Sequence, residues 1–401
     1  MFFLTFSAKL VLVIAASGIV QAVLLAALLY FHHKSDKSVN GFLSLYILLV
    51  SILMLIPAVQ ELFSWQVIVY LLPFPLLIGP FVYLYVRSFR EAITWRKAWP
   101  HFVLFVVFLF VDYLYLPTLV HKYPLSHHVP GEILLNPASP VRIMLRIVRI
   151  VQMIVYYVLA ERALTSYQKS IHHLFSETSR ISLAWVRWLI NGYLFLIISL
   201  LILFYFVVRY PDQFDLLIII NTAIIIPYIY LITFKGLAQP TLWHKKTDEQ
   251  KESLEKEIKS AADIEALKKD RKRDQISLQH ETKIGEIVSR IMEAMHNEKL
   301  YQQSELTLQN LADRIKIPSY QVSQAINEGM QKNFYDLVNG YRVDEAKRLL
   351  LDLKNRNFTI LSVGFEAGFN SKTTFNTVFK KFTGLTPTEY RDTQQPVPVS
   401  V

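Results

Sequence analysis

Seven long apolar runs dominate the first 240 residues of this 401-residue chain. A helix needs about 17–25 apolar residues to cross the hydrocarbon of a bilayer, and most of the runs reach that length. A single run could be a buried helix of a soluble protein, but seven in series favour an all-α, seven-helix transmembrane bundle over residues 1–240. The runs are Leu10–Phe31, Phe42–Val59, Val67–Val86, Phe102–Leu116, Ile143–Ala160, Trp188–Val208 and Leu216–Phe234.

The Lys and Arg residues between the runs predict how this bundle is oriented. The first, third and fifth connections carry ten of them, whereas the opposite side carries three. Cytoplasmic loops are the Lys- and Arg-rich ones. We therefore expect a multi-pass protein of the bacterial inner membrane, in contact with lipid, with its N-terminus outside and its C-terminus cytoplasmic. A cleaved signal peptide is the alternative for the first run, but no positive charge precedes Lys9.

A few ionisable residues lie inside the apolar runs. Arg142, Arg146 and Arg149 are spaced to share one face of a helix, and Asp112 lies near the outer end of the fourth run. Such groups usually pair or face a water-filled cavity. They form either a structural Arg–Asp pair with the remaining Arg reaching the membrane surface, or an outward-open pocket for an anionic small molecule. In the second case Asp112, Arg146 and Arg149 would bind the ligand.

The composition excludes several kinds of chemistry. The chain has no Cys, so disulfides, thiolate metal sites and a cysteine nucleophile are ruled out. His121, His127 and His128 lie between the fourth and fifth runs, but no matching carboxylate pattern accompanies them, and we expect no metal site. The motifs H-E-x-x-H, G-x-S-x-G and the P-loop are also missing. Neither an enzyme nor a cofactor is expected.

From residue 241 the composition changes abruptly. Residues 241–283 are rich in Glu and Lys and nearly lack aromatic residues, which predicts a charged helical linker. A short apolar seam fades after Leu267, so we expect an interrupted helix rather than a long coiled coil. Residues 241–401 carry 25 Lys and Arg against 23 Asp and Glu. The net charge of +10 therefore arises mainly in the apolar half and is no evidence for nucleic-acid binding.

Helical patterns resume at Ile284 and continue into a helix-turn-helix spacing. Thr307 is a predicted N-cap, followed by a helix over Leu308–Ile315, a turn over Lys316–Pro318 and a second helix capped by Ser319. The exposed face predicted for this second helix carries Tyr320, Ser323, Gln324 and Asn327.

A second copy of the pattern follows a long amphipathic helix over Phe334–Asp352. A scaffold helix is predicted over Thr359–Phe369, with Gly368 at a turn that needs a left-handed residue. Ser371 begins the second helix of this copy, in which Phe375, Phe379 and Phe382 are predicted to face inward. The predicted outward residues are Lys372, Thr373, Asn376, Thr377 and Lys380.

The stretch GFNSKTTFNTVFKKFTGLTPTEYR, residues 368–391, resembles the signature of AraC/XylS-family transcription regulators. The resemblance extends over residues 300–391 and includes the Gly-Phe turn, the Phe-Lys pair, Gly-x-Thr-Pro and the closing Tyr-Arg. It implies a C-terminal domain, residues 284–401, in which two helix-turn-helix units joined by a long helix read two successive major-groove segments. Two positions depart from the pattern: Lys316 stands where Gly is usual, and Gly364 where Ala is usual.

The resemblance also implies a function and its residues. The whole layout is similar to a seven-span branch of the family, so we expect a membrane-anchored, sequence-specific regulator of transcription that couples an outside or membrane signal to double-stranded DNA. A homodimer would lengthen the recognised site. The alternative is a membrane transporter or membrane enzyme with a regulatory helix-turn-helix tail. The DNA contacts implied are Tyr320, Ser323, Gln324, Asn327, Lys372, Thr373, Asn376, Thr377 and Lys380.

Overall fold

A computed structural model gives the chain two compact units, which are described separately. The first unit comprises Met1–Thr165 and Leu183–Lys246, and the second comprises Ser166–Ser182 and Thr247–Val401. The predicted all-α class is confirmed within the described parts, which add only one isolated β-bridge. The structure describes residues 2–31, 37–53, 71, 73–91, 93–122, 140–178, 183–210, 214–237, 278–352 and 358–394.

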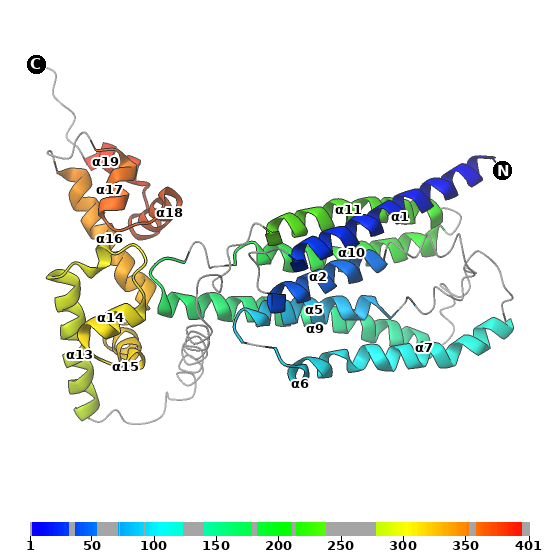
Figure 1. The fold of residues 1–401 in the computed structure, drawn as a ribbon, viewed down its shortest axis with the longest axis horizontal. Helices are drawn as coiled ribbons and strands as arrows, with labels where there is room; N and C mark the ends of the chain where they lie inside the picture. Colours follow the sequence, from blue (N-terminus) through cyan, green and yellow to red (C-terminus); the bar gives the residue numbers. More distant parts are fainter. Residues whose placement is uncertain are drawn as a thin grey trace, which may run out of the picture. The chain divides into compact units, whose positions relative to one another are not determined.

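Long apolar helices build the first unit (Figure 1). Each of the seven predicted runs lies wholly or partly on one of them. In this unit α1 packs against α2 and α11, and α10 packs against α11 and α5. The helices are α1 (Phe2–Phe31), α2 (Lys37–Ile52), α5 (Pro75–Ser88), α6 (Trp95–Ala98), α7 (Val103–Lys122), α9 (Pro140–Leu174), α10 (Val186–Arg209) and α11 (Phe214–Leu237).

Polar side chains join the apolar helices α1 and α2. The side-chain amide of Asn40 donates to the carbonyl of Leu29 at 3.0 Å, and the hydroxyl of Ser44 donates to the carbonyl of Ala26 at 3.0 Å. Both side chains are buried. These hydrogen bonds satisfy polar groups that are buried between two apolar helices.

The prediction of seven membrane spans is not supported by the described residues. Two helical stretches there are long and apolar enough to cross a membrane, and length and composition alone are weak evidence. These two stretches are Trp95–Leu114 and Val186–Phe206. Three further apolar helical stretches are shorter, namely Ala15–Phe31, Val39–Ile52 and Ala223–Leu237.

Proline and charge explain why two of the other predicted runs fall short. The helix of the third run, α5, begins only at Pro75, since proline suits the first turn of a helix, and it continues through Pro80. The fifth run lies on α9, which is long enough but carries Arg146 and Arg149 within the run. An apolar run in the sequence is therefore not the same as an uninterrupted apolar helix.

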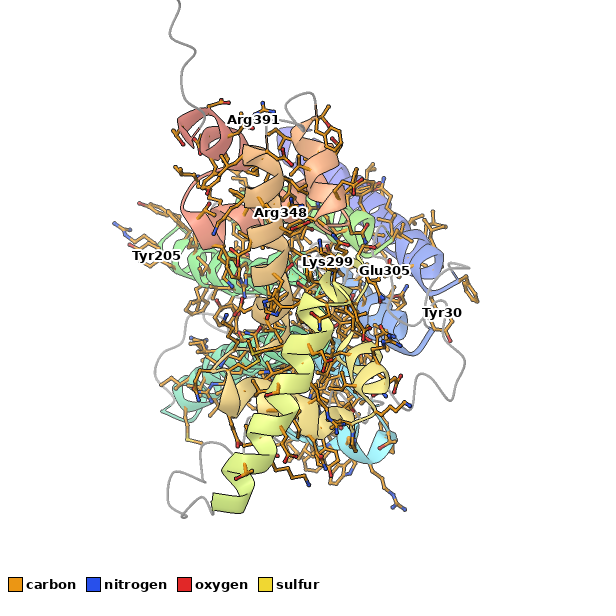
Figure 2. All side chains as sticks on the ribbon, turned by 90° about the vertical axis from the view of Figure 1, so that its left-hand side faces the viewer. Tyr30, Tyr205, Lys299, Glu305, Arg348 and Arg391 are labelled. Atoms are coloured by element: carbon orange, nitrogen blue, oxygen red, sulfur yellow. The ribbon has the colours of Figure 1, made fainter. Side chains whose placement is uncertain are left out.

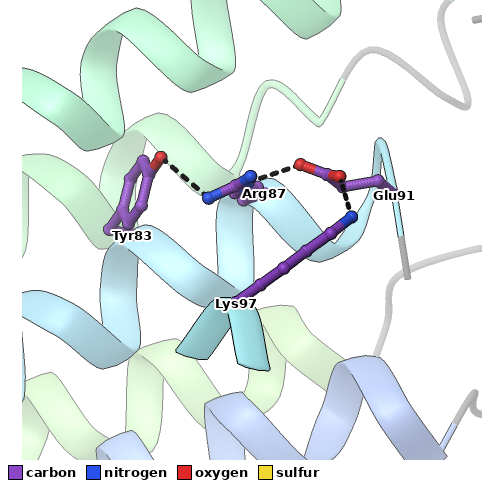
Figure 3. Close-up of polar contacts among 4 residues, drawn as sticks. All are labelled: Tyr83, Arg87, Glu91 and Lys97. Carbon is purple, nitrogen blue, oxygen red and sulfur yellow. Dashed lines mark hydrogen bonds and ion pairs between the residues drawn. The ribbon is translucent and has the colours of Figure 1, made fainter. Parts of the chain in front are cut away.

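Two of the cations predicted to mark a cytoplasmic loop form one cluster at the end of α5 (Figure 3). Arg87 and Lys97 both reach the carboxylate of Glu91, each at 2.5 Å, and Arg87 also donates to the hydroxyl of Tyr83 at 3.5 Å. Partial burial raises the pKa of Glu91, but the hydrogen bonds from Lys97 and Arg87 outweigh it and lower the pKa overall. The cluster fixes the turn between α5 and α6.

The second unit consists of two groups of short helices joined by α16. Figure 1 shows α13 to α15 towards one end of α16 and α17 to α19 towards the other. Most of the predicted linker lies outside the described residues, which resume at the start of α13. The helices are α13 (Leu278–His296), α14 (Leu308–Ile315), α15 (Ser319–Gln324), α16 (Phe334–Leu351), α17 (Ile360–Glu366), α18 (Lys372–Thr383) and α19 (Pro387–Gln394).

An aromatic core holds the second group of helices together. Phe369, Phe375 and Phe379 are buried and pack with apolar residues of α16 and α17. Neighbouring rings meet at centroid distances of 5.0 Å for Phe369–Phe375 and 5.6 Å for Phe375–Phe379. The prediction that Phe382 also faces inward is wrong, because 37% of this residue is exposed. Phe382 lies one turn beyond Phe379, at the end of the helix where the core stops.

Candidate nucleic-acid interface

The first helix-turn-helix begins with a capped helix. The hydroxyl of Thr307 accepts from the backbone N–H of Asn310 at 3.1 Å, and the Asn310 side chain accepts in return from the N–H of Thr307. This reciprocal capping box confirms the predicted N-cap. The helix ends at Lys316, which adopts the left-handed conformation with φ 56° and ψ 43°. A left-handed Lys costs about 1–2 kcal/mol relative to glycine, and the turn keeps its shape despite it.

The start and end of α15 differ from the prediction. Ser319 was expected to cap this helix, but the N-cap is Pro318, and Ser319 is the first helical residue. The cap makes no side-chain hydrogen bond. After Gln324 the helix widens into a π-turn over Ala325–Gly329. Such a turn has no sequence signature, since it differs from an α-helix only in which carbonyl each N–H reaches.

The face predicted to read DNA is only partly exposed on α15. Tyr320 is 56% exposed, and Gln324 is partly exposed, with its amide donating to the Glu328 carboxylate at 3.2 Å. Ser323 is 6% exposed, so its predicted place on the open face is wrong. The partly exposed Asn327 donates to the carbonyl of Ser323 at 2.8 Å. The α-helix turns 100° per residue, which carries Ser323 towards the core side, next to the buried Val322.

The second reading helix, α18, matches the prediction closely. Gly368 forms the turn before it with φ +94°, as expected for a left-handed glycine. Ser371 is the N-cap, and its hydroxyl accepts from the N–H of Thr374 at 3.1 Å. The predicted outward residues are exposed or, for Asn376, partly exposed; they are Lys372, Thr373, Asn376, Thr377 and Lys380.

The cations around the second unit divide into two groups. Lys299 and Arg348, both labelled in Figure 2, lie near the carboxylate of Glu345 at 3.7 and 2.9 Å. The hydrogen bond from Arg348 is the main reason why the pKa of Glu345 is lowered. In contrast, no ion pair is found for Lys372 or Lys380 among the described residues. Both lysines are exposed and suit contacts with a polyanion, although the charge of Lys380 also acts on the carboxylate of Glu389.

Arg342, the buried centre of the second unit, was not among the residues predicted from the sequence. This residue of α16 is 0% exposed, and its guanidinium donates to the carbonyls of Tyr301 and Gln303, both at 2.7 Å. Burial lowers the pKa of Arg342 to about 10, so the side chain remains cationic at neutral pH. Its position four residues after the buried Val338 places it on the apolar face of α16. That is the signal by which the sequence could have shown it.

A segment from the first half of the sequence also belongs to this unit. Residues Phe175–Thr178 follow α9 directly, and Phe175 pairs with Thr307 in the isolated antiparallel bridge. The hydroxyl of Ser176 donates to the carbonyl of Leu306 at 2.6 Å and accepts from Arg342 at 3.2 Å. We call Phe175–Thr178 the clasp. No local sequence pattern predicts the clasp, since its contacts at the start of α14 and on α16 and α18 all lie more than 100 residues away along the chain.

The structure brings together two of the residues predicted to bind an anionic ligand. The guanidinium of Arg149 lies 2.7 Å from the carboxylate of Asp112 and 4.7 Å from the ring centre of Phe108. Arg146 lies instead over the ring of Phe204, at 5.0 Å. The Asp112–Arg149 pair is the structural alternative named above, and ligand binding stays a prediction.

The remaining predicted polar residues of the first unit lie outside the described side chains. These are Arg142, His121, His127 and His128. Where side chains are described, no group of three or more His, Asp or Glu is arranged to hold a metal ion.

Comparisons with known proteins agree with the geometry of the second unit. Residues 311–393 match the family described as a helix-turn-helix domain. An HTH-type transcriptional regulator of Staphylococcus aureus is 30% identical over 93 residues, which are 23% of this chain and 12% of that protein. The melibiose operon regulatory protein of Escherichia coli is 27% identical over 90 residues, which are 22% of this chain and 29% of that protein.

The chain thus spans only a small part of the length of these relatives. Among solved structures, the C-terminal domain of AraT, a response regulator from Geobacillus stearothermophilus, is 27% identical, with a TM-score of 0.26. The match covers 29% of this chain and 91% of that domain. The named relatives are described as a transcriptional regulator and an operon regulatory protein. The C-terminal part of the chain, over residues 311–393, is a helix-turn-helix domain of the AraC type.

Proposed function

We propose that the chain is a membrane-anchored regulator of transcription that binds DNA in a sequence-specific way. The observation that carries the proposal is the pair of reading helices, α15 and α18, on one domain whose fold matches a helix-turn-helix family. Both helices present polar side chains, and α18 adds exposed lysines at positions 372 and 380. Two reading helices joined by α16 suit two successive segments of the major groove, into which a helix fits. A second copy of the chain would double the site.

Base reading gives the first test. Gln324 can bond to adenine through two hydrogen bonds, and Lys372 can donate to guanine. In the free protein the Gln324 amide is held by Glu328, so that hydrogen bond must break on binding. Each of Gln324→Ala and Lys372→Ala should lose about 1–3 kcal/mol at its own base position. Selection of bound sites from a random duplex pool by the full-length protein measures this preference.

A control separates base reading from general weakening. Gln309 also has its amide bonded to an acid one turn away, Asp313, but lies on the scaffold helix α14. Gln309→Ala should therefore leave the selected sequences unchanged. Identical base preferences in wild type, Gln324→Ala and Lys372→Ala would show that the proposed reading faces are wrong.

Exposed apolar side chains on the first unit support anchoring in a membrane. Leu24, Phe110 and Phe234 are 63%, 61% and 70% exposed, and Tyr205 on α10 projects outward from the ribbon (Figure 2). Soluble monomers rarely expose large contiguous apolar surfaces, whereas lipid-facing helices do. We place this unit in the bacterial inner membrane, with the N-terminus outside and the C-terminal domain in the cytoplasm, where the genome is.

Reporter fusions test this topology. A fusion after residue 240 should be fluorescent with a cytoplasmic reporter, inactive with alkaline phosphatase, and recovered in the membrane fraction. The physical reason is the excess of Lys and Arg in alternate connections, which retains those connections on the cytoplasmic side. A full-length fusion recovered in the soluble fraction would contradict anchoring, and phosphatase activity would contradict the orientation.

A further inference from the structure

The clasp joins the unit by backbone pairing at the start of α14. The N–H of Ser176 donates to the carbonyl of Leu306 at 3.2 Å, next to the bridge between Phe175 and Thr307. Ser176 is completely buried by this pairing. Leu306 and Thr307 directly precede the first scaffold helix, so the clasp is attached at the first helix-turn-helix.

The same segment is bound by the helix that connects the two halves. The side-chain amide of Asn339 donates to the carbonyl of Ser176 at 3.0 Å, and Arg342 donates to the hydroxyl of Ser176 at 3.2 Å. Asn339 and Arg342 are both 0% exposed. Two buried polar residues of α16 therefore depend on the clasp for part of their hydrogen bonding.

The third contact reaches the second reading helix. The hydroxyl of Thr374, in the first turn of α18, donates to the carboxylate of Glu177 at 3.3 Å. Lys372 and Thr373, two of the predicted DNA contacts, precede Thr374 directly. Burial, followed by the charges of Glu177 and Asp336, raises the pKa of Tyr335 on α16 to about 12. The hydrogen bond from Thr374 therefore places the carboxylate of Glu177 at the first turn of α18, and its charge also acts on the buried guanidinium of Arg342.

The segment before the clasp is docked as well. The ring of His172, in the last turn of α9, meets Tyr335 edge-on at a centroid distance of 4.6 Å. α9 is one continuous helix from Pro140 to Leu174, and it passes without a break into the clasp.

We propose that the clasp is a releasable inhibitory contact, and that undocking Phe175–Thr178 raises the affinity of the domain for DNA. The inference rests on the proposed DNA-binding function. Helix N-termini attract phosphate groups, and a carboxylate at the first turn of α18 repels them. The clasp also bridges both helix-turn-helix units and α16, so it holds the two reading helices in one mutual arrangement. Release of the clasp therefore removes both the repulsion of phosphate by Glu177 and the fixed arrangement of α15 and α18.

Neutralising Glu177 is the first experiment. Full-length Glu177→Gln in detergent micelles should bind a random-sequence DNA duplex at least about fivefold more tightly than wild type, the lower end of usual couplings between sites. Fluorescence anisotropy at fixed salt measures the affinity. Glu305→Gln is the matched control, because it removes the same charge from an exposed position beside Leu306, labelled in Figure 2. If the affinity for DNA rises equally in both variants, the effect comes from net charge alone, and the proposal of an inhibitory clasp is wrong.

A reversible cross-link is the second experiment. The chain has no Cys, so Phe175→Cys with Thr307→Cys introduces a single pair at the antiparallel bridge. The oxidised protein, with the clasp locked, should bind DNA at least about fivefold more weakly than the same protein after reduction. The Thr307→Cys single variant controls for the lost cap.

The results of the cross-linking experiment distinguish failure of the inhibitory clasp from failure of the proposed DNA-binding function. Equal binding by the oxidised and reduced forms overturns the inhibitory clasp but leaves the DNA-binding function standing. Tighter binding by the locked form also overturns it, since the clasp would then assemble the reading surface. No binding by wild type, by Glu177→Gln and by the reduced protein overturns the proposed function itself, and the clasp with it.

Discussion

Replacing Arg342 by Met should destabilise the C-terminal unit by about 3–5 kcal/mol, the usual cost of removing one partner from a buried charged network. Methionine has a similar length but no donor, so the carbonyls of Tyr301, Gln303 and Ser304 lose their hydrogen bonds inside the unit. Buried acceptors without partners are costly because water cannot replace the lost donor. Hydrogen exchange of the α16 amides in the full-length protein measures the local free energy of opening.

The same helix offers a matched control. Arg348 lies on α16 too, but its side chain is 58% exposed and pairs with Glu345 at the surface. Arg348→Met should cost about 1 kcal/mol or less, as exposed ion pairs do. Similar exchange rates in both variants would mean that burial of the Arg342 network does not stabilise the unit.

The second large effect is expected at Gly368. A Cβ at this position would lie 2.5 Å from the carbonyl oxygen of Tyr301 and 2.7 Å from the Cα of Gln302, both of them backbone atoms that cannot turn aside. Gly368→Ala should therefore add overpacking, about 1–3 kcal/mol, to the left-handed strain of about 1–2 kcal/mol. Loss of exchange protection in α17 and α18 measures the sum.

Gly384 separates the two contributions. It is left-handed as well, with φ +81°, but a Cβ there would meet nothing within 4 Å. Gly384→Ala should cost only the conformational strain, about 1–2 kcal/mol. If the two alanine variants are equally stable, the close contact at Gly368 does not lower the stability of the unit. The backbone around Tyr301 would then move to accommodate the methyl group.

Features with a local cause were predictable from the sequence. The Thr307 cap and the glycine turn at Gly368 each depend on a few neighbouring residues, and both are found. The Ser371 cap is found for the same reason. The candidate reading face of α18 followed as well, because its inward aromatic residues fix which residues point outward.

Features decided by distant contacts were not predictable. The burial of Ser323 depends on how α15 packs, and helical periodicity places it at the border between two faces. The place of Arg342 on the apolar face of α16 is visible in the sequence, but most of its hydrogen-bond partners are carbonyls about 40 residues away and Ser176, 166 residues away, and these were not predictable. The number of membrane spans stays a prediction, since among the described residues two helical stretches are long and apolar enough to cross a membrane.

The distance along the chain between the clasp and its partners has a consequence for biosynthesis. Ser176 leaves the ribosome 130 residues before Leu306, to which it is bonded in the finished protein. At about 5–20 residues per second, translation of that interval takes roughly 6–26 s. During this time the residues at the start of α14 and on α16 and α18 that bind the clasp have not yet been made. The C-terminal unit cannot fold completely until its last helices leave the ribosome. Each newly made molecule therefore passes through a period with the clasp open before it first closes.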